Sequence, residues 1–118
     1  MYGIPAGETF AFLVGRRLDQ LCFGRYQLQL RFDKAVTVSV ESDLGVRSPG
    51  STEVIVEDTR DAAAILVAAL ATCVTVVEVH GSRSFSMTFE GGLSLRVIDG
   101  EESYESFQVH HGENVIVV

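Results

Sequence analysis

Apolar and polar residues alternate with a period of two in four stretches of this chain, at 26–32, 36–41, 84–89 and 93–97. Successive side chains of a β-strand point to opposite faces, so this alternation places apolar residues on one face and polar residues on the other. Strands with one buried and one hydrated face are typical of antiparallel sheets. The pattern therefore predicts a protein built mainly of antiparallel β-structure.

Short connectors and one helix complete the predicted fold. Asp-Lys at 33–34 and Gly-Gly at 91–92 have the length and residue types of hairpin turns. A helix is predicted at about 59–71, because Asp58 can cap its first turn and its apolar residues share one face. The stretch 44–52 is expected to be a loop, since Gly, Pro and Ser interrupt it.

We expect one α+β domain spanning 1–118, mostly antiparallel β, with the helix between two three-stranded meanders and a strand pair at the C-terminus. The hydrophobic pattern at 32–40 resembles that at 89–97, so 16–41 and 73–98 form a candidate internal repeat. The common pattern of β-hairpins could produce the same likeness without a duplication. The sequence leaves open whether the meanders form a sandwich or a closed barrel.

Negative charge is concentrated in the second half of the chain. The formal net charge is −7, and it arises from residues 57–118, which hold ten acidic and three basic residues. A chain this acidic is not expected to bind nucleic-acid phosphate. The acidic half could serve solubility alone, or it could attract a basic protein partner through complementary potential.

The densest polar segment lies near the C-terminus, ahead of the last predicted strand pair. We predict a partner-binding loop there, because loops on a rigid scaffold carry much binding and an aromatic among acids resembles an interface anchor. A hydrated turn is the alternative interpretation. A small-ligand or enzymatic site near Tyr104, Glu105 and His110 is the rival hypothesis. The predicted partner-binding residues are Asp99, Glu101, Glu102, Tyr104 and Glu105.

The sequence contains no recognised catalytic motif. It has no nucleophile elbow, no P-loop and no zinc-protease motif. Glu78 and His80 share one face of a predicted strand and could join a distant histidine at a metal, but hydrated surface side chains are the favoured interpretation. We therefore predict no metal, no cofactor and no catalytic residue, and we favour a non-enzymatic protein.

Cysteine usage and hydropathy favour a cytoplasmic protein without membrane contact. Cys22 and Cys73 lack metal-binding spacing and lie in apolar surroundings, which predicts reduced thiols. No basic and apolar leader begins the chain. The stretch 62–77 carries no charge, but it is shorter than the run of about 20 apolar residues that a spanning helix needs.

Two segments, 15–33 and 93–118, resemble an uncharacterised family of small bacterial proteins that is carried as a domain of unknown function. The likeness covers most of the chain and rests on hydrophobic-pattern motifs, such as Leu-Ser-Leu-Arg-Val-Ile-Asp at 93–99. The resemblance implies no catalytic residues. Some small acidic proteins with this layout look like immunity proteins that neutralise toxins, which implies an interaction role. A structural homo-oligomer, such as a homodimer that uses the apolar strand at 115–118, is a further alternative.

Overall fold

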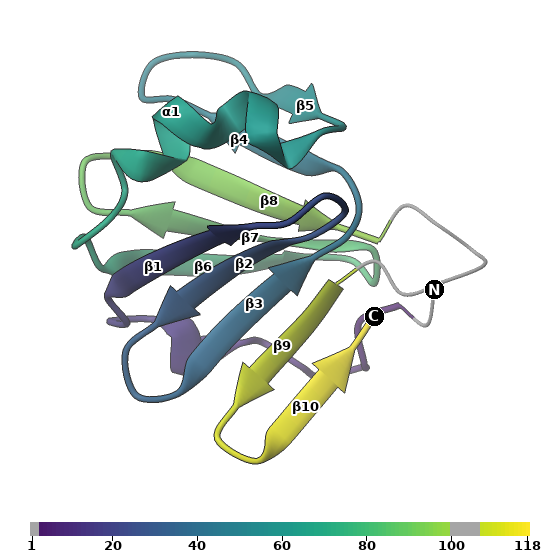
Figure 1. Ribbon diagram of the computed structural model, residues 1–118. Helices are drawn as coiled ribbons and strands as arrows, with labels where there is room; N and C mark the ends of the chain where they lie inside the picture. Colours follow the sequence, from purple (N-terminus) through teal and green to yellow (C-terminus); the bar gives the residue numbers. More distant parts are fainter. Residues whose placement is uncertain (1–2, 100–106) are drawn as a thin grey trace.

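The computed structural model describes residues 3–99 and 107–118, which form two five-stranded antiparallel sheets (Figure 1). The expected α+β fold, mostly antiparallel β, is confirmed. The first sheet has the order β1-β2-β3-β9-β10, with β1 (Leu18–Phe23), β2 (Leu28–Phe32), β3 (Val36–Val40), β9 (Phe107–His111) and β10 (Asn114–Val117). The second has the order β5-β4-β8-β7-β6, with β4 (Leu44–Arg47), β5 (Val54–Val56), β6 (Val74–His80), β7 (Ser84–Phe89) and β8 (Ser94–Ile98).

The helical segment between the two meanders is shorter than predicted. A 3₁₀ turn, η2 (Thr59–Ala62), leads into α1 (Ala63–Val67), whereas the sequence pattern predicted one helix over 59–71. Asp58 is the N-cap as expected, because its side chain accepts a hydrogen bond from the Arg60 N–H at 3.0 Å. The helical conformation has ended by Ala71, where φ is +67°. Among the described residues, no helix has the length and apolar character needed to cross a membrane.

The sequence pattern predicted that the whole stretch 44–52 is a loop, and this prediction is wrong for its first part. Strand β4 occupies Leu44–Arg47. Leu44 and Val46 are buried against the core, and Gly45 lies between them. Gly45 pairs with Ile55 on one side and Arg96 on the other. Because a glycine presents no side chain on the outer face, β4 lacks the polar alternation that reveals the other strands.

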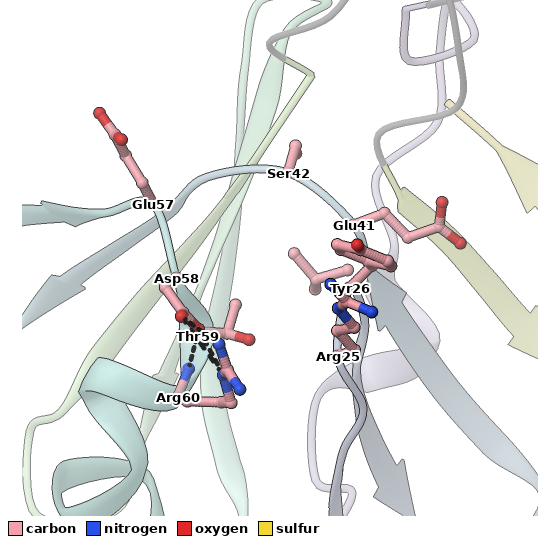
Figure 2. Close-up of a pocket in the computed structure, with 9 residues that line it drawn as sticks. Arg25, Tyr26, Glu41, Ser42, Glu57, Asp58, Thr59 and Arg60 are labelled. Atoms are coloured by element: carbon pink, nitrogen blue, oxygen red, sulfur yellow. Dashed lines mark hydrogen bonds and ion pairs between the residues drawn. The ribbon is translucent and has the colours of Figure 1, made fainter.

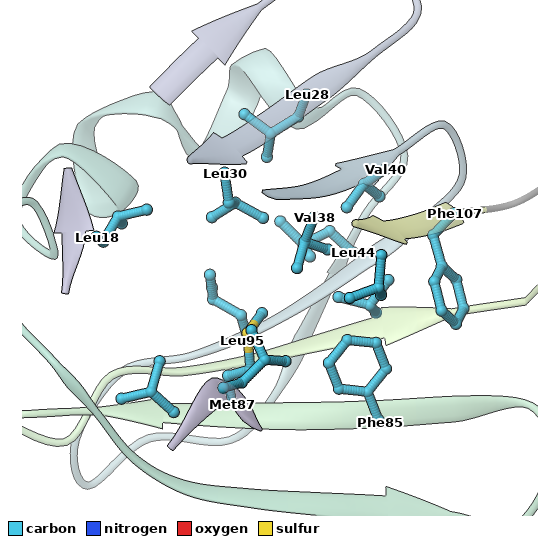
Figure 3. Close-up of a cluster of buried hydrophobic side chains, with 14 of the residues drawn as sticks. Leu18, Leu28, Leu30, Val38, Val40, Leu44, Phe85, Met87, Leu95 and Phe107 are labelled. Atoms are coloured by element: carbon cyan, nitrogen blue, oxygen red, sulfur yellow. The ribbon is translucent and has the colours of Figure 1, made fainter. Parts of the chain in front are cut away.

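The hydrophobic core lies between the two sheets (Figure 3). Leu28 and Leu30 project into it from β2, and Phe85 and Met87 project into it from β7, all with no exposed surface. Burying a side chain of this size stabilises the fold by about 1.5–3 kcal/mol. Phe10, just before the 3₁₀ turn η1 (Ala11–Leu13), stacks on Phe85 with ring centroids 4.3 Å apart. The N-terminal segment is therefore part of the core.

The two meanders, β1–β3 and β6–β8, have matching irregularities. The register of β1 against β2 shifts after Leu18, and the register of β6 against β7 shifts after Val74. The two meanders also pair with each other where they begin, through an antiparallel bridge between Arg17 and Cys73. The sheets are therefore joined at one corner. An evolutionary duplication as the origin of this likeness stays a prediction.

Candidate functional site

The predicted partner-binding loop is only partly within the described residues. Glu101, Glu102, Tyr104 and Glu105 lie outside them. Asp99 is described, and its side chain is only 2% exposed. Its Oδ2 accepts a hydrogen bond from the Gly3 N–H at 3.2 Å and lies 3.9 Å from Arg83 Nε. Asp99 therefore connects the end of β8 to the N-terminal segment, a position that does not favour contact with a partner.

His110, named in the rival hypothesis, lies on the polar face of the first sheet. Its Nε2 is 3.1 Å from Gln108 Oε1. It lines a shallow hollow of about 330 Å³ together with polar side chains of β2 and β3, namely Gln29, Arg31, Thr37 and Ser39. Among the described residues, no group of three His, Cys, Asp or Glu side chains could hold a metal ion.

The Cys73 thiol is poorly suited to nucleophilic chemistry. Cys22 and Cys73 are both free and half-buried. Desolvation raises the pKa of the Cys73 thiol, and the carboxylate of Glu90 raises it further. A raised pKa disfavours the thiolate, which is the reactive form.

A polar hollow of about 420 Å³ on the outer face of the second sheet surrounds an ion pair between β8 and the chain just before β5. Arg96 donates hydrogen bonds to both carboxylate oxygens of Glu53, from Nε at 2.9 Å and from Nη2 at 2.7 Å. The pair lies over Gly45, where an added Cβ would be 2.6 Å from Glu53 Oε2. Gly45 therefore leaves room for a bidentate contact that fixes the beginning of β5 across β4.

Two adjoining hollows flank Ile65 on α1, and we call them together the Ile65 groove. The larger, of about 650 Å³, lies between the β4–β5 hairpin and the helical segment. The smaller, of about 250 Å³, lies between α1, Pro49 and the turn at 90–93. Ser48 and Ile65 line both hollows, so the two adjoin at the Ile65 side chain.

Apolar side chains form much of this groove and remain open to solvent. Val54 is 60% exposed, Ile55 is 46% exposed and Ile65 is 42% exposed. All three line the larger hollow. Val67, on the same helix as Ile65, is 54% exposed. Single exposed apolar residues are ordinary, whereas a concave group of them marks an interaction surface.

Every ionisable side chain that lines the Ile65 groove is acidic. Glu57 and Asp61 line the larger hollow, and Glu90 lines the smaller. Glu90 Oε1 accepts a hydrogen bond from the Cys73 N–H at 2.7 Å, which fixes its position. The nearby cation, Arg60, donates to the Asp58 carboxylate at 2.7 Å and lowers the pKa of Asp58. The groove therefore combines an apolar floor with a negative rim, which Arg60 compensates in part through its interaction with Asp61.

Another hollow, of about 330 Å³, lies on the other side of η2 and has mixed charge (Figure 2). Arg25 and Tyr26 border it from the β1–β2 turn, with the Arg25 guanidinium 5.0 Å from the Tyr26 ring centroid. Across the gap, the chain from Glu57 to Arg60 borders it with the Asp58–Arg60 pair. Because both signs of charge line this hollow, it selects a partner's charge less strongly than the Ile65 groove does.

Comparison of this chain with protein-family models, with curated proteins and with solved structures finds no match. The sequence pattern alone does not reveal the Ile65 groove. One local signal was present, the apolar run Val54 to Val56 between Glu53 and Glu57.

Proposed function

We propose that this protein is a non-enzymatic interaction module that binds a basic segment of a partner protein in the Ile65 groove. The observation that carries the proposal is the lining of the groove, where exposed Val54, Ile55 and Ile65 lie beside carboxylates and no basic side chain contributes. Apolar contact supplies affinity, and complementary charge supplies specificity and a faster encounter.

The acidic groove refines the expectation of an acidic binding surface. Glu57, Asp61 and Glu90 all belong to the half of the chain that holds the net negative charge. The proposed contact thus uses that half, at a position other than the loop that the sequence predicted. An immunity-like role, in which the partner is a toxin, is one form that such an interaction could take.

The proposal can be tested with three synthetic peptides of about ten residues, the length of a long strand. Each alternates Val with a second residue, which is Lys, Gln or Glu. We expect the Lys peptide to bind more tightly than the Gln peptide and the Glu peptide to show no binding, as measured by fluorescence anisotropy. Raising the ionic strength from about 0.01 M to about 1 M shortens the Debye length from about 30 Å to about 3 Å. This screening should weaken the binding of the Lys peptide.

A matched pair of variants locates the binding site. Ile65→Lys places a charge on the apolar floor and should lower the affinity for the Lys peptide by about tenfold or more. Val115→Lys, on the edge strand β10 of the other sheet, changes a valine of comparable exposure (49%) and should leave the affinity unchanged. Equal affinity of the Lys and Gln peptides, or unchanged binding by the Ile65→Lys variant, would contradict the proposal.

A further inference from the structure

We infer that the partner segment binds as an added β-strand on the free edge of β5, and this inference rests on the proposed function. β5 is an edge strand of the second sheet, beside α1 (Figure 1). Among the described residues it pairs only with β4, through Val54, Ile55 and Val56. An unpaired edge offers backbone N–H and C=O groups to an extended segment, which is the basis of recognition by strand addition.

The position of the groove supports this mode of binding. Four consecutive residues, Val54 to Glu57, line the larger hollow. Consecutive side chains of a strand point to opposite faces, so a hollow on one face would be lined by alternate residues only. The larger hollow is lined by consecutive residues of β5 and also by Val46 of β4, so it extends from the edge of β5 over the face of the hairpin that Val46 shares. The space available to a partner is therefore next to the backbone of β5.

The side chains around β5 define what the added strand should carry. Val54 and Ile55 point to opposite faces, and both are about half exposed or more. An added strand can therefore place apolar residues against β5 on either face, with Ile65 of α1 closing one side of the hollow. Glu57 follows β5 directly and has no ion-pair partner among the described residues. A Lys or Arg near that end of the added strand would complement it.

The charges at the ends of β5 favour a different protein over a second copy of this chain. Antiparallel pairing of two β5 strands around Ile55 would place Glu53 of each copy opposite Glu57 of the other. Like charges directly opposite one another destabilise a strand pair. Glu53 is held by Arg96 at 2.7 Å, so part of its charge is compensated and the repulsion is reduced. A basic segment meets no such repulsion.

The test compares the alternating Lys/Val peptide with the same peptide N-methylated at two adjacent central residues. Adjacent amides of a strand point to opposite edges, so this change removes a donor from both edges while keeping charge and apolar content. We expect methylation to weaken binding by about tenfold or more, through lost hydrogen bonds and the added bulk. We also expect the unmethylated peptide to slow amide hydrogen exchange within Val54–Val56.

The outcomes separate this inference from the proposed function. Weaker binding of the methylated peptide, with slower exchange in β5, supports strand addition. Strand addition is overturned if both peptides bind equally, or if hydrogen exchange in β5 is unchanged on binding. In that case the Ile65 groove remains the binding site, provided that Ile65→Lys still weakens peptide binding. If neither peptide binds, strand addition and the proposed function are both overturned.

Discussion

The two meanders share one framework but are extended by different elements. On one side, β3 pairs with β9 and the first sheet ends at β10. On the other side, β8 pairs with β4 and the second sheet ends at β5, beside α1. Val118, which directly follows β10, is buried and exchanges two backbone hydrogen bonds with Phe107. These bonds continue the pairing of β10 with β9, so both sheets end in an edge strand, and β5 differs from β10 in having the Ile65 groove beside it.

The corner where the sheets join shows the likeness in atomic detail. In the first meander, the Arg17 N–H donates to Asp33 Oδ1 at 3.1 Å. In the second, the Cys73 N–H donates to Glu90 Oε1 at 2.7 Å. In return, the Asp33 N–H donates a hydrogen bond to the backbone carbonyl of Arg17. The Glu90 N–H does the same to the carbonyl of Cys73. One of these two carboxylates, Glu90, also lines the Ile65 groove.

The largest expected effect comes from the residues that the two meanders contribute to the core. Leu28 in β2 and Phe85 in β7 occupy matching places, each opposite the valine near the end of the third strand of its meander. Phe85 also contacts the rings of Phe10 and Phe107, at 4.3 and 5.5 Å between centroids. We expect Phe85→Ala to lower the free energy of unfolding by about 3–5 kcal/mol and Leu28→Ala by about 2–5 kcal/mol. Urea denaturation should show the larger loss for Phe85→Ala, and the reverse order would contradict this description of the core.

A smaller effect is expected at the corner. Asp33→Ala and Glu90→Ala each remove one hydrogen bond to a backbone N–H, so each should lower the free energy of unfolding by about 1 kcal/mol. Only Glu90→Ala should also weaken the binding of the Lys/Val peptide, because Asp33 does not line the Ile65 groove. Denaturation and fluorescence anisotropy on the same two proteins give both readouts. Equal weakening of the peptide by both variants would contradict the specialised role of the second meander.

The smallest effect concerns the acid dependence of stability. Hydrogen bonds from the Arg60 side chain and N–H lower the pKa of Asp58 in the folded protein. A lowered pKa adds stability that is complete above the unfolded value of about 3.9 and is lost as pH falls through the folded value. Asp58→Asn should keep the N-cap, since Asn caps well, but make stability slightly less sensitive to pH below about 4. An unchanged acid limb of the stability curve would show that the pair contributes nothing.

Much of the fold could be predicted from the sequence because local alternation determines it. β2, β3 and β7 lie within three of the alternating stretches, and β8 lies within the fourth except for Ile98. β4 was missed since Gly45 hides its alternation, and the helix was predicted too long because an Ala-rich sequence carries no signal for the turn at Ala71. These differences arise from single residues whose effect depends on backbone conformation.

The candidate site was harder to predict because distant segments build it. The Ile65 groove requires β5, α1 and the turn at 90–93 to meet, and no local pattern reports that meeting. Asp99 shows the same limit, since it was predicted as a surface residue but accepts a hydrogen bond from Gly3, at the other end of the chain. Local sequence predicts strands well, whereas surfaces depend on which strands become neighbours.

The most direct test of the central claim is an NMR titration of the ¹⁵N-labelled protein with the Lys/Val peptide. The claim is that a basic segment binds at the β5 edge of the second sheet and not at the β10 edge of the first. Peptide-induced shift changes should concentrate in β5, α1 and the turn at 90–93, and β10 should be unaffected. Changes centred on β10 or on the polar face of the first sheet would contradict it.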